Sequence, residues 1–277
     1  MRKLSFQELL ATRWSLGNFL CVGLDSELIR IPTHIRSEFP KPTDAVVEFN
    51  EKIIEATHSF VCAYKINPNF YIYSGGYEAL VKTMAFIKNF VPGVPIILDC
   101  KFADVDYTSR VFATSIFSRF EVDAITVNPY LGRVSLTPLL KRKNKGIFIV
   151  CHTSNKGAAE FQKLEIARQP FYSHVASSVA NNWNQDKNCG LVVSGKNPKI
   201  LEEIRAIANN LPFLIPGIGS QGGNLLDAVK AGKTRTNRGV IITISRDIIF
   251  ASRDKNFLES ANLKATHYRD CIQKYIL

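Results

Sequence analysis

Short apolar runs alternate with amphipathic segments along the whole chain. We predict strands from these runs at residues 19–25, 61–66, 95–99, 124–128, 147–151, 190–195, 212–217 and 239–245. Each run is apolar almost throughout, which indicates burial on both faces and is typical of a parallel sheet covered by helices. A half-exposed strand would instead alternate apolar and polar residues.

The segments between the runs carry helical periodicity. This periodicity is clearest in residues 42–60 and 197–210. In the second segment the residues predicted to share one helix face are Ile200, Ile204, Ile207 and Ala208. Repeated strand–helix pairs of this number predict a closed (β/α)8 barrel of the TIM type. The residues before the first run are expected to form a helix that caps the bottom of the barrel.

The chain reads as a single α/β domain spanning residues 1–277. No linker-like stretch, shift of composition or low-complexity segment interrupts the repeats. An open, doubly wound sheet is the structural alternative. That fold usually carries a GxGxxG fingerprint after its first strand, whereas this chain has VGLDSE there, so the barrel is favoured.

Composition indicates the kind of protein. The hydrophobic fraction of 46% and the charged fraction of 21% are those of an ordinary globular chain. No apolar run reaches the roughly 18 residues that a membrane span needs, and the opening residues lack the apolar segment of a secretory signal. We therefore expect a cytoplasmic protein with no membrane partner. The six cysteines are scattered without a CxxC pair, which favours reduced, structural thiols.

The net charge of +11 suggests an anionic partner, either nucleic acid or a small phosphorylated substrate. The densest basic run contains Lys141, Arg142, Lys143 and Lys145 at the end of a predicted helix, where cations suit the helix dipole. We interpret this run as a solvated helix terminus. No RNP-type motif, zinc-finger spacing or aromatic–basic interleaving supports a nucleic-acid partner.

Polar residues collect where the apolar runs end. In a (β/α)8 barrel the chemistry lies at the carboxyl ends of the strands, so these residues are expected to form one ring. The ring contains Asp25, Lys65, Asn67, Asp99, Lys101, Asn128, Thr153, Ser154, Ser194, Gly195, Gly217, Gly219, Ser245 and Arg246.

The stretch ILDCKFADVDYTS concentrates charge at the exit of the third run. Side chains alternate along a strand, so Asp99 and Lys101 are predicted to point to the same side, above Ile97 in the barrel interior. Asp104 and Thr108 are four residues apart at the start of the next helix, so they are expected to share a face. The alternative to a functional site is that these charges form surface ion pairs, which only keep the end of the strand soluble. Asp106 lies on a different face and is not included in the site.

A second cluster suggests a phosphate site. The loop PGIGSQGG exposes backbone N–H groups ahead of a helix, and Arg246 follows the eighth run. Barrels often bind phosphate at these last two loops. The five histidines show no metal-ligand spacing, so no metal site is predicted. Only His152 ends a strand, and we interpret it as a structural residue.

These motifs together resemble the orotidine 5′-phosphate decarboxylase family. The segment 99–104 matches its D-x-K-x-x-D motif, and Thr108 matches the threonine that follows. CVGLD, YKINPNFY, CHTSNKGA, PFLIPGIGSQGG and the terminal SR agree in order along nearly the whole chain, and the glycine-rich loop is most similar to the type 2 branch.

The resemblance implies cofactor-independent, metal-independent decarboxylation of orotidine 5′-monophosphate to UMP, the last step of de novo pyrimidine biosynthesis. It implies that Lys101 protonates C6 of the pyrimidine, that Asp99 faces the substrate carboxylate, and that Lys65 holds Asp99 and the ribose. It also implies a homodimer with shared active sites, to which Asp104 and Thr108 are donated across the interface. The remaining implied substrate contacts are Asp25 at the ribose, Ser154 at the pyrimidine, and Gly219, Gln221 and Arg246 at the phosphate.

Some positions depart from the family pattern, and two other readings remain. Ala103 replaces the usual glycine, and VVSGK and ITISR replace the common forms, which leaves the phosphate contacts around Ser194, Gly195 and Lys196 open. Sugar-phosphate decarboxylases and epimerases share the charged motif but would need a metal ligand set. A nucleic-acid-binding protein on a catalytically inactive barrel would show salt-sensitive binding and no turnover.

Overall fold

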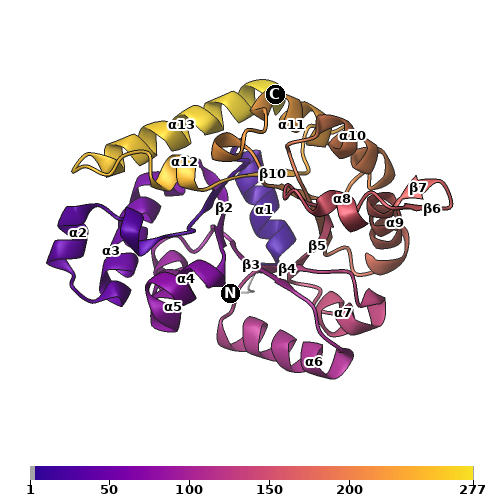
Figure 1. Cartoon of the computed structure of the whole chain (residues 1–277), viewed down its shortest axis with the longest axis horizontal. Helices are drawn as coiled ribbons and strands as arrows, with labels where there is room; N and C mark the ends of the chain where they lie inside the picture. Colours follow the sequence, from indigo (N-terminus) through magenta and orange to yellow (C-terminus); the bar gives the residue numbers. More distant parts are fainter. Residues whose placement is uncertain (1–3, 277) are drawn as a thin grey trace.

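A closed barrel of parallel strands forms the centre of the computed structural model, which describes residues 4–276 (Figure 1). Around the barrel the order is β1 (Leu20–Gly23), β10 (Val240–Ile244), β9 (Phe213–Ile215), β8 (Cys189–Val193), β5 (Gly146–His152), β4 (Ala124–Val127), β3 (Ile96–Phe102) and β2 (Val61–Ile66). Each predicted apolar run overlaps one of these strands, although β3 and β5 extend beyond their runs and β8 begins one residue before its run. The (β/α)8 barrel is therefore confirmed, and the open doubly wound sheet is wrong.

Helices surround the barrel (Figure 1). The longer ones are α3 (Pro42–Thr57), α5 (Gly76–Phe90), α6 (Asp106–Thr114), α7 (Gly132–Leu140), α9 (Phe171–Ser178), α10 (Pro198–Ile207), α11 (Leu225–Gly232) and α13 (Phe257–Ile276). Shorter elements are η1 (Leu28–Arg30), α2 (Thr33–Glu38), η2 (His58–Phe60), α4 (Pro68–Ser74), η3 (Ser115–Arg119), α8 (Ala158–Phe161), η4 (Val179–Trp183), η5 (Gly219–Gln221) and α12 (Arg246–Ile249). A small antiparallel hairpin, β6 (Glu165–Ile166) with β7 (Gln169–Pro170), projects from the barrel.

Asn-Pro pairs start two of the helices. The side chains of Asn67 and Asn197 accept hydrogen bonds from backbone N–H groups in the first turns of α4 and α10. The proline that follows each asparagine occupies the first helical position, where its missing N–H costs nothing. These caps fix the points at which the chain leaves the barrel rim and turns into a helix.

The predicted capping helix is confirmed as α1 (Phe6–Ser15). Ser5 and Glu8 form a capping box at its start. Phe6 and Leu10 are buried against the residues inside the barrel, and the Phe6 ring meets Phe148 edge-on with 5.6 Å between centroids. The helix therefore closes the amino end of the barrel and leaves the carboxyl end open.

The predicted apolar face of α10 is wrong at one position. Ile200, Ile204 and Ala208 are buried, but Ile207 is 36% exposed and Arg205 is buried instead. The Arg205 guanidinium lies 3.4 Å from the centroid of the Phe213 ring and donates to backbone carbonyls around it. Burial of this arginine is therefore compensated by hydrogen bonds that an isoleucine could not make.

Two other local predictions need correction. Lys145 is buried and donates to the Val122 carbonyl oxygen at 2.5 Å, so it is not part of a solvated helix terminus, although α7 does end just before the basic run. Helix α6 begins at Asp106, so Asp104 precedes the helix. The Asp104 carboxylate accepts the Val105 N–H at 2.7 Å, which holds it in the strand–helix connection.

All six cysteines are free thiols, as predicted, and four of them are buried: Cys21, Cys62, Cys151 and Cys189. None of the helices within residues 4–276 combines the length and the apolar character needed to cross a bilayer.

Candidate active site

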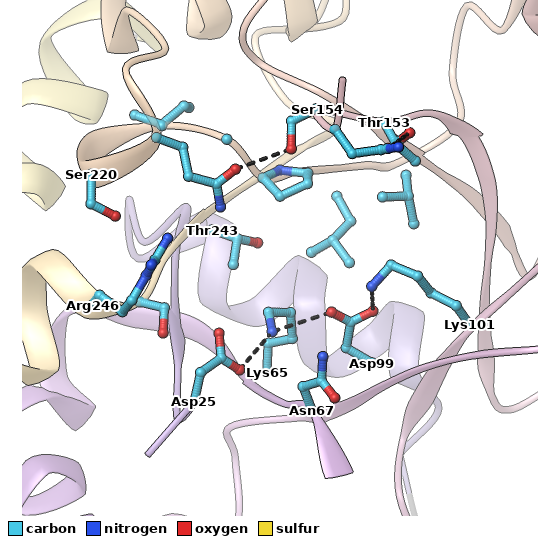
Figure 2. A pocket seen from close by; sticks show the side chains of 18 of the residues that line it. Asp25, Lys65, Asn67, Asp99, Lys101, Thr153, Ser154, Ser220, Thr243 and Arg246 are labelled. Carbon is cyan, nitrogen blue, oxygen red and sulfur yellow. Dashed lines mark hydrogen bonds and ion pairs between the residues drawn. The ribbon is translucent and has the colours of Figure 1, made fainter. Parts of the chain in front are cut away.

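A cavity of about 470 Å³ opens at the carboxyl ends of the barrel strands. Its floor includes Val192, Leu214 and Thr243 from β8, β9 and β10. Charged residues, polar residues and Phe70 surround the floor, and Figure 2 shows two separated ends, one with Asp99 and Lys101 and the other with Arg246 and Ser220. The polar lining consists of Asp25, Lys65, Asn67, Asp99, Lys101, Thr153, Ser154, Asn155, Ser220, Gln221, Ser245 and Arg246.

Four charged side chains form a continuous array at one end of the cavity. The buried Lys65 ammonium lies 3.1 Å from Asp25 Oδ1 and 3.3 Å from Asp99 Oδ2. The Lys101 Nζ atom lies 2.7 Å from Asp99 Oδ1. The signs therefore alternate from Asp25 through Lys65 and Asp99 to Lys101 (Figure 2). The Lys101 side chain is 44% exposed, so its ammonium can reach a bound molecule.

Neighbouring charges keep the inner part of this array ionised. Burial alone would lower the pKa of Lys65, but Asp25 and Asp99 outweigh it and raise that pKa. Burial would raise the pKa of Asp99, but Lys65 and Lys101, with hydrogen bonds from Lys101 and Thr126, lower it to about 2. Both groups are thus charged at neutral pH without any bound molecule.

A bulge at the end of β3 places Asp99 and Lys101. Leu98 pairs with Ile125 and Phe102 pairs with Val127, so β3 takes four steps where β4 takes two. The Lys101 backbone has φ of 44°, in the left-handed region that residues other than glycine rarely adopt. Ile97 lies in the barrel interior beneath, as predicted. The alternating pattern of an ideal strand is therefore replaced by a distorted strand end.

Asp25 is supported by a buried polar network behind it. The Ser26 hydroxyl donates to Asn50 Oδ1 at 2.5 Å, and the Asn50 amide donates to the hydroxyls of Tyr71 at 3.0 Å and Thr83 at 3.1 Å. Ser26, Asn50, Tyr71 and Thr83 are all 0% exposed. The network ties the loop after β1 to α3, α4 and α5, so the position of Asp25 is set by the surrounding helices.

The opposite end of the cavity is formed by the loops after β9 and β10. Gly217, Gly219 and Gly222 have positive φ of 95°, 74° and 85°, which lets the loop turn tightly. The Ser154 hydroxyl donates to Gln221 Oε1 at 3.0 Å and so joins the loop after β5 to this one. Arg246 begins α12 and lines the same end (Figure 2).

Most of the predicted site residues meet in this cavity, but three do not line it. Asp104 and Thr108 lie beyond its wall, on the connection to α6 and on α6 itself. Gly219 also lies outside the lining: a Cβ there would be 3.3 Å from the Tyr268 hydroxyl and 3.4 Å from Asp247 Oδ2. Of the wider predicted ring, Asn128, Ser194 and Gly195 are likewise absent from the lining.

Sequence reasoning missed several polar residues. Thr126 is fully buried in β4 and its hydroxyl donates to Asp99 Oδ1 at 2.8 Å. Ser220 and Asn155 line the cavity from the loops, and Thr243 lies in its floor. Thr126 and Thr243 each stand two residues before a predicted ring residue, on the same side of the strand, so alternation could have found them.

Within residues 4–276 there is no group of three or more His, Cys, Asp or Glu side chains placed to hold a metal ion. His152 lies outside the cavity lining. It is 5% exposed, its ring meets Tyr172 edge-on, and burial together with Lys163 lowers its pKa.

The chain matches the description "Orotidine 5′-phosphate decarboxylase / HUMPS family" over residues 18–261. It belongs to that family. Among its relatives, the orotidine 5′-phosphate decarboxylase of Cellvibrio japonicus is 40% identical over 270 residues, which is 97% of this chain and 98% of the relative. The protein of the same name from Janthinobacterium sp. is 38% identical over 274 residues, covering 99% of this chain and 100% of the relative.

Solved structures of the family share the fold. The OMP decarboxylase of Leishmania donovani superposes with a TM-score of 0.83 at 32% identity, over 98% of this chain and 99% of that one. The UMP synthase of Leishmania donovani superposes with a TM-score of 0.87 at 34% identity, over 99% of this chain but only 57% of that one. The structural similarity thus extends over nearly all of this chain.

Proposed function

We propose that this family member converts orotidine 5′-monophosphate to UMP and CO₂. The observation that carries the proposal is the cavity itself, which has the Asp25–Lys65–Asp99–Lys101 array at one end and Arg246 with the glycine-rich loop at the other. Full-length similarity to relatives named orotidine 5′-phosphate decarboxylase supports the same reaction.

The charge of the cavity suits this substrate. Lys65, Lys101 and Arg246 outnumber the two carboxylates of Asp25 and Asp99, so an anionic molecule is favoured. We assign phosphate binding to Arg246 and Gln221, with Gly219 shaping the loop behind them. Ser154, which donates to Gln221, is assigned to the pyrimidine edge. Asp25 and Lys65 are assigned to the ribose hydroxyls.

The chemical step needs a cation and a proton at C6. When the C6–carboxylate bond breaks, CO₂ leaves and its bonding electron pair stays on C6. The Lys101 ammonium stabilises this developing negative charge and then transfers a proton to C6, which gives UMP and a neutral amine. Asp99, ionised and 2.7 Å from the Lys101 ammonium, holds that group beside the reacting carbon and faces the position of the leaving carboxylate.

A homodimer with shared sites is the second part of the proposal. Asp104 and Thr108 lie outside the cavity of their own chain, next to an exposed apolar surface on α6, α7 and their connections. This surface contains Val105, Tyr107, Val111, Tyr130, Leu131 and Val134, which are 45–78% exposed. Apolar side chains in such a cluster are typical of an interface, and a partner that covers them would bring its Asp104 toward Lys101.

Turnover of the purified protein tests the reaction. After treatment with a chelator, the protein is expected to convert orotidine 5′-monophosphate to UMP, with UMP identified by chromatography and CO₂ trapped from the headspace. Sugar phosphates offered as alternative substrates are expected to remain unchanged. A well-folded sample that leaves orotidine 5′-monophosphate intact would contradict the proposal.

The assignment of residues 1–277 to one domain and the cytoplasmic location stay predictions.

A further inference from the structure

Thr126 binds all three residues of the Asp99–Cys100–Lys101 segment. Its hydroxyl accepts the Lys101 backbone N–H at 2.9 Å and donates to Asp99 Oδ1 at 2.8 Å. Its carbonyl oxygen accepts the Cys100 thiol at 3.4 Å. Thr126 is 0% exposed and does not line the cavity, so it acts on a bound molecule only through these neighbours.

These contacts fall in the gap left by the β3 bulge. The ladder between β3 and β4 is interrupted after Leu98 and resumes where Asn128 N–H donates to the Phe102 carbonyl at 2.8 Å. Within this gap the Lys101 N–H has the Thr126 hydroxyl as its acceptor. The left-handed backbone of Lys101 costs energy and persists only when its surroundings hold it there. The threonine hydroxyl supplies part of that hold.

The hydroxyl also fixes the orientation of the Asp99 carboxylate. A hydroxyl has one proton, so accepting the Lys101 N–H leaves that proton for Asp99 Oδ1. Asp99 Oδ1 then accepts hydrogen bonds from both the Thr126 hydroxyl and the Lys101 ammonium, while Asp99 Oδ2 lies 3.3 Å from the Lys65 ammonium. With the hydroxyl removed, the carboxylate loses its one neutral donor within the described array and can rotate between the two ammonium groups.

We propose that Thr126 is a positioning residue for decarboxylation, whose hydroxyl holds the Lys101 backbone and the Asp99 carboxylate in one fixed arrangement. This rests on the proposed function, because it assigns Thr126 to the step carried out by Lys101. Thr126 is remote from the phosphate end, so its hydroxyl contributes to the rate of the chemical step and little to substrate binding.

The test compares Thr126→Val, which keeps the shape and removes the hydroxyl, with Thr126→Ser, which keeps the hydroxyl. Thr126→Val is expected to lower kcat for orotidine 5′-monophosphate by roughly ten- to a hundredfold, because misplacement of a reacting group by a fraction of an ångström has effects of this size. KM and the dissociation constant of UMP are expected to stay within about threefold of wild type, and Thr126→Ser is expected to regain most of kcat.

Thr57→Val is the matched control. Thr57 is also 0% exposed, and its hydroxyl bonds the Ile53 carbonyl and the Tyr64 hydroxyl, but it is the last residue of α3 and does not line the cavity. This control separates loss of a buried hydroxyl bond in general from loss of the Thr126 contacts. Its kcat is expected to match that of wild type even where its melting temperature falls.

Either of two results would overturn the inference: a folded Thr126→Val enzyme with more than about half of the wild-type kcat, or Thr126→Ser as impaired as Thr126→Val. A measurement on the wild-type protein covers the case in which Thr126→Val does not fold. The Lys101 amide is expected to exchange slowly with D₂O because it is bonded to a buried hydroxyl, and exchange at the rate of an open loop would contradict the contact. Failure of wild-type turnover would count against the proposed function, and this exchange result would still decide the role of Thr126 in holding Lys101.

Discussion

At the scale of single residues, the site depends on groups that set the charge and direction of their neighbours. Lys65 is 6% exposed at its side chain and remains an ammonium because two carboxylates lie within 3.3 Å. Asp99 remains a carboxylate because two ammonium groups and the Thr126 hydroxyl point at it. The array is therefore organised for an anionic substrate before that substrate arrives.

The low pKa of Asp99 predicts a dependence of stability on pH. Its pKa is depressed from 3.8 to about 2 in the folded protein, so its ionised form stabilises the fold above about pH 4, and this contribution is lost as the pH falls toward 2. Between about pH 6 and about pH 3, wild type is expected to lose about 1 kcal/mol more unfolding free energy than Asp99→Asn. Urea denaturation at the two pH values measures the difference.

Asp106→Asn is the control for this prediction, because Asp106 is exposed and lies outside the cavity. It is expected to lose as much stability on acidification as wild type does. Equal losses for Asp99→Asn and wild type would mean that Asp99 is not held ionised by its neighbours.

The charged residues of the site could be predicted from the sequence, whereas their support could not. Asp99 and Lys101 interrupt an apolar strand, so they are conspicuous, and the ends of parallel strands meet at one edge. Alternation places Thr126 on the inward side of its strand, but a threonine in the run AITV is an ordinary strand residue, so nothing in the sequence shows that it supports Asp99 and Lys101. Its role depends on the bulge in β3, and a bulge is a property of the pairing between two strands.

At the scale of elements, α10 shows why a periodic pattern can misplace a face. The apolar periodicity identified the helix correctly. It predicted that Ile207 is buried, and it could not predict the burial of Arg205, because arginine is not an apolar residue. The Arg205 side chain donates to the carbonyl oxygens of Gly232 at 2.8 Å, Leu211 at 2.7 Å and Gly239 at 3.0 Å. It thereby joins the ends of α10 and α11 to the starts of β9 and β10.

Substitution of Arg205 is expected to affect stability and not catalysis. Burial lowers the pKa of Arg205 to about 9, and its hydrogen bonds to carbonyls compensate for that burial. Lysine has fewer donors and no planar face to stack on Phe213, so Arg205→Lys is expected to lower the unfolding free energy by about 2–4 kcal/mol. The exposed Arg235→Lys serves as the control and is expected to unfold at the wild-type denaturant concentration. A stable Arg205→Lys enzyme, or one with an impaired kcat at low temperature, would contradict this division of roles.

At the scale of the whole molecule, the amino end of the barrel contributes to stability and the carboxyl end carries the site. Helix α1 closes the amino end with Phe6 and Leu10, and Arg205 ties the connections there. The carboxyl end holds the cavity, whose charged lining would be costly to bury without a bound anion. The repeated strand–helix pairs made this division predictable, because every ring residue lies at or just after the carboxyl end of an apolar run.

Shared sites in a dimer predict complementation between two inactive variants. Lys101→Ala lacks the proton donor in its own cavity, and Asp104→Ala lacks the group offered to the partner. A mixed dimer of the two would contain one intact site, so an equal mixture refolded together is expected to recover about a quarter of wild-type activity for random pairing in a twofold dimer. Steady-state assays with sedimentation analysis measure this. Activity that stays at the level of the two parents, with dimers present, would show that Asp104 does not serve the partner's site.

The central claim is that Lys101 delivers the proton that replaces the departing CO₂. The most direct measurement is the rate at which Lys101→Ala converts orotidine 5′-monophosphate to UMP. Lys143→Ala is the control, because Lys143 is an exposed lysine that pairs with Asp186 and does not line the cavity. Lys101→Ala is expected to lose kcat by at least about a thousandfold, because it removes both the proton donor and the adjacent cation, while Lys143→Ala keeps wild-type kcat. A folded Lys101→Ala enzyme that turns over within about tenfold of wild type would contradict the mechanism.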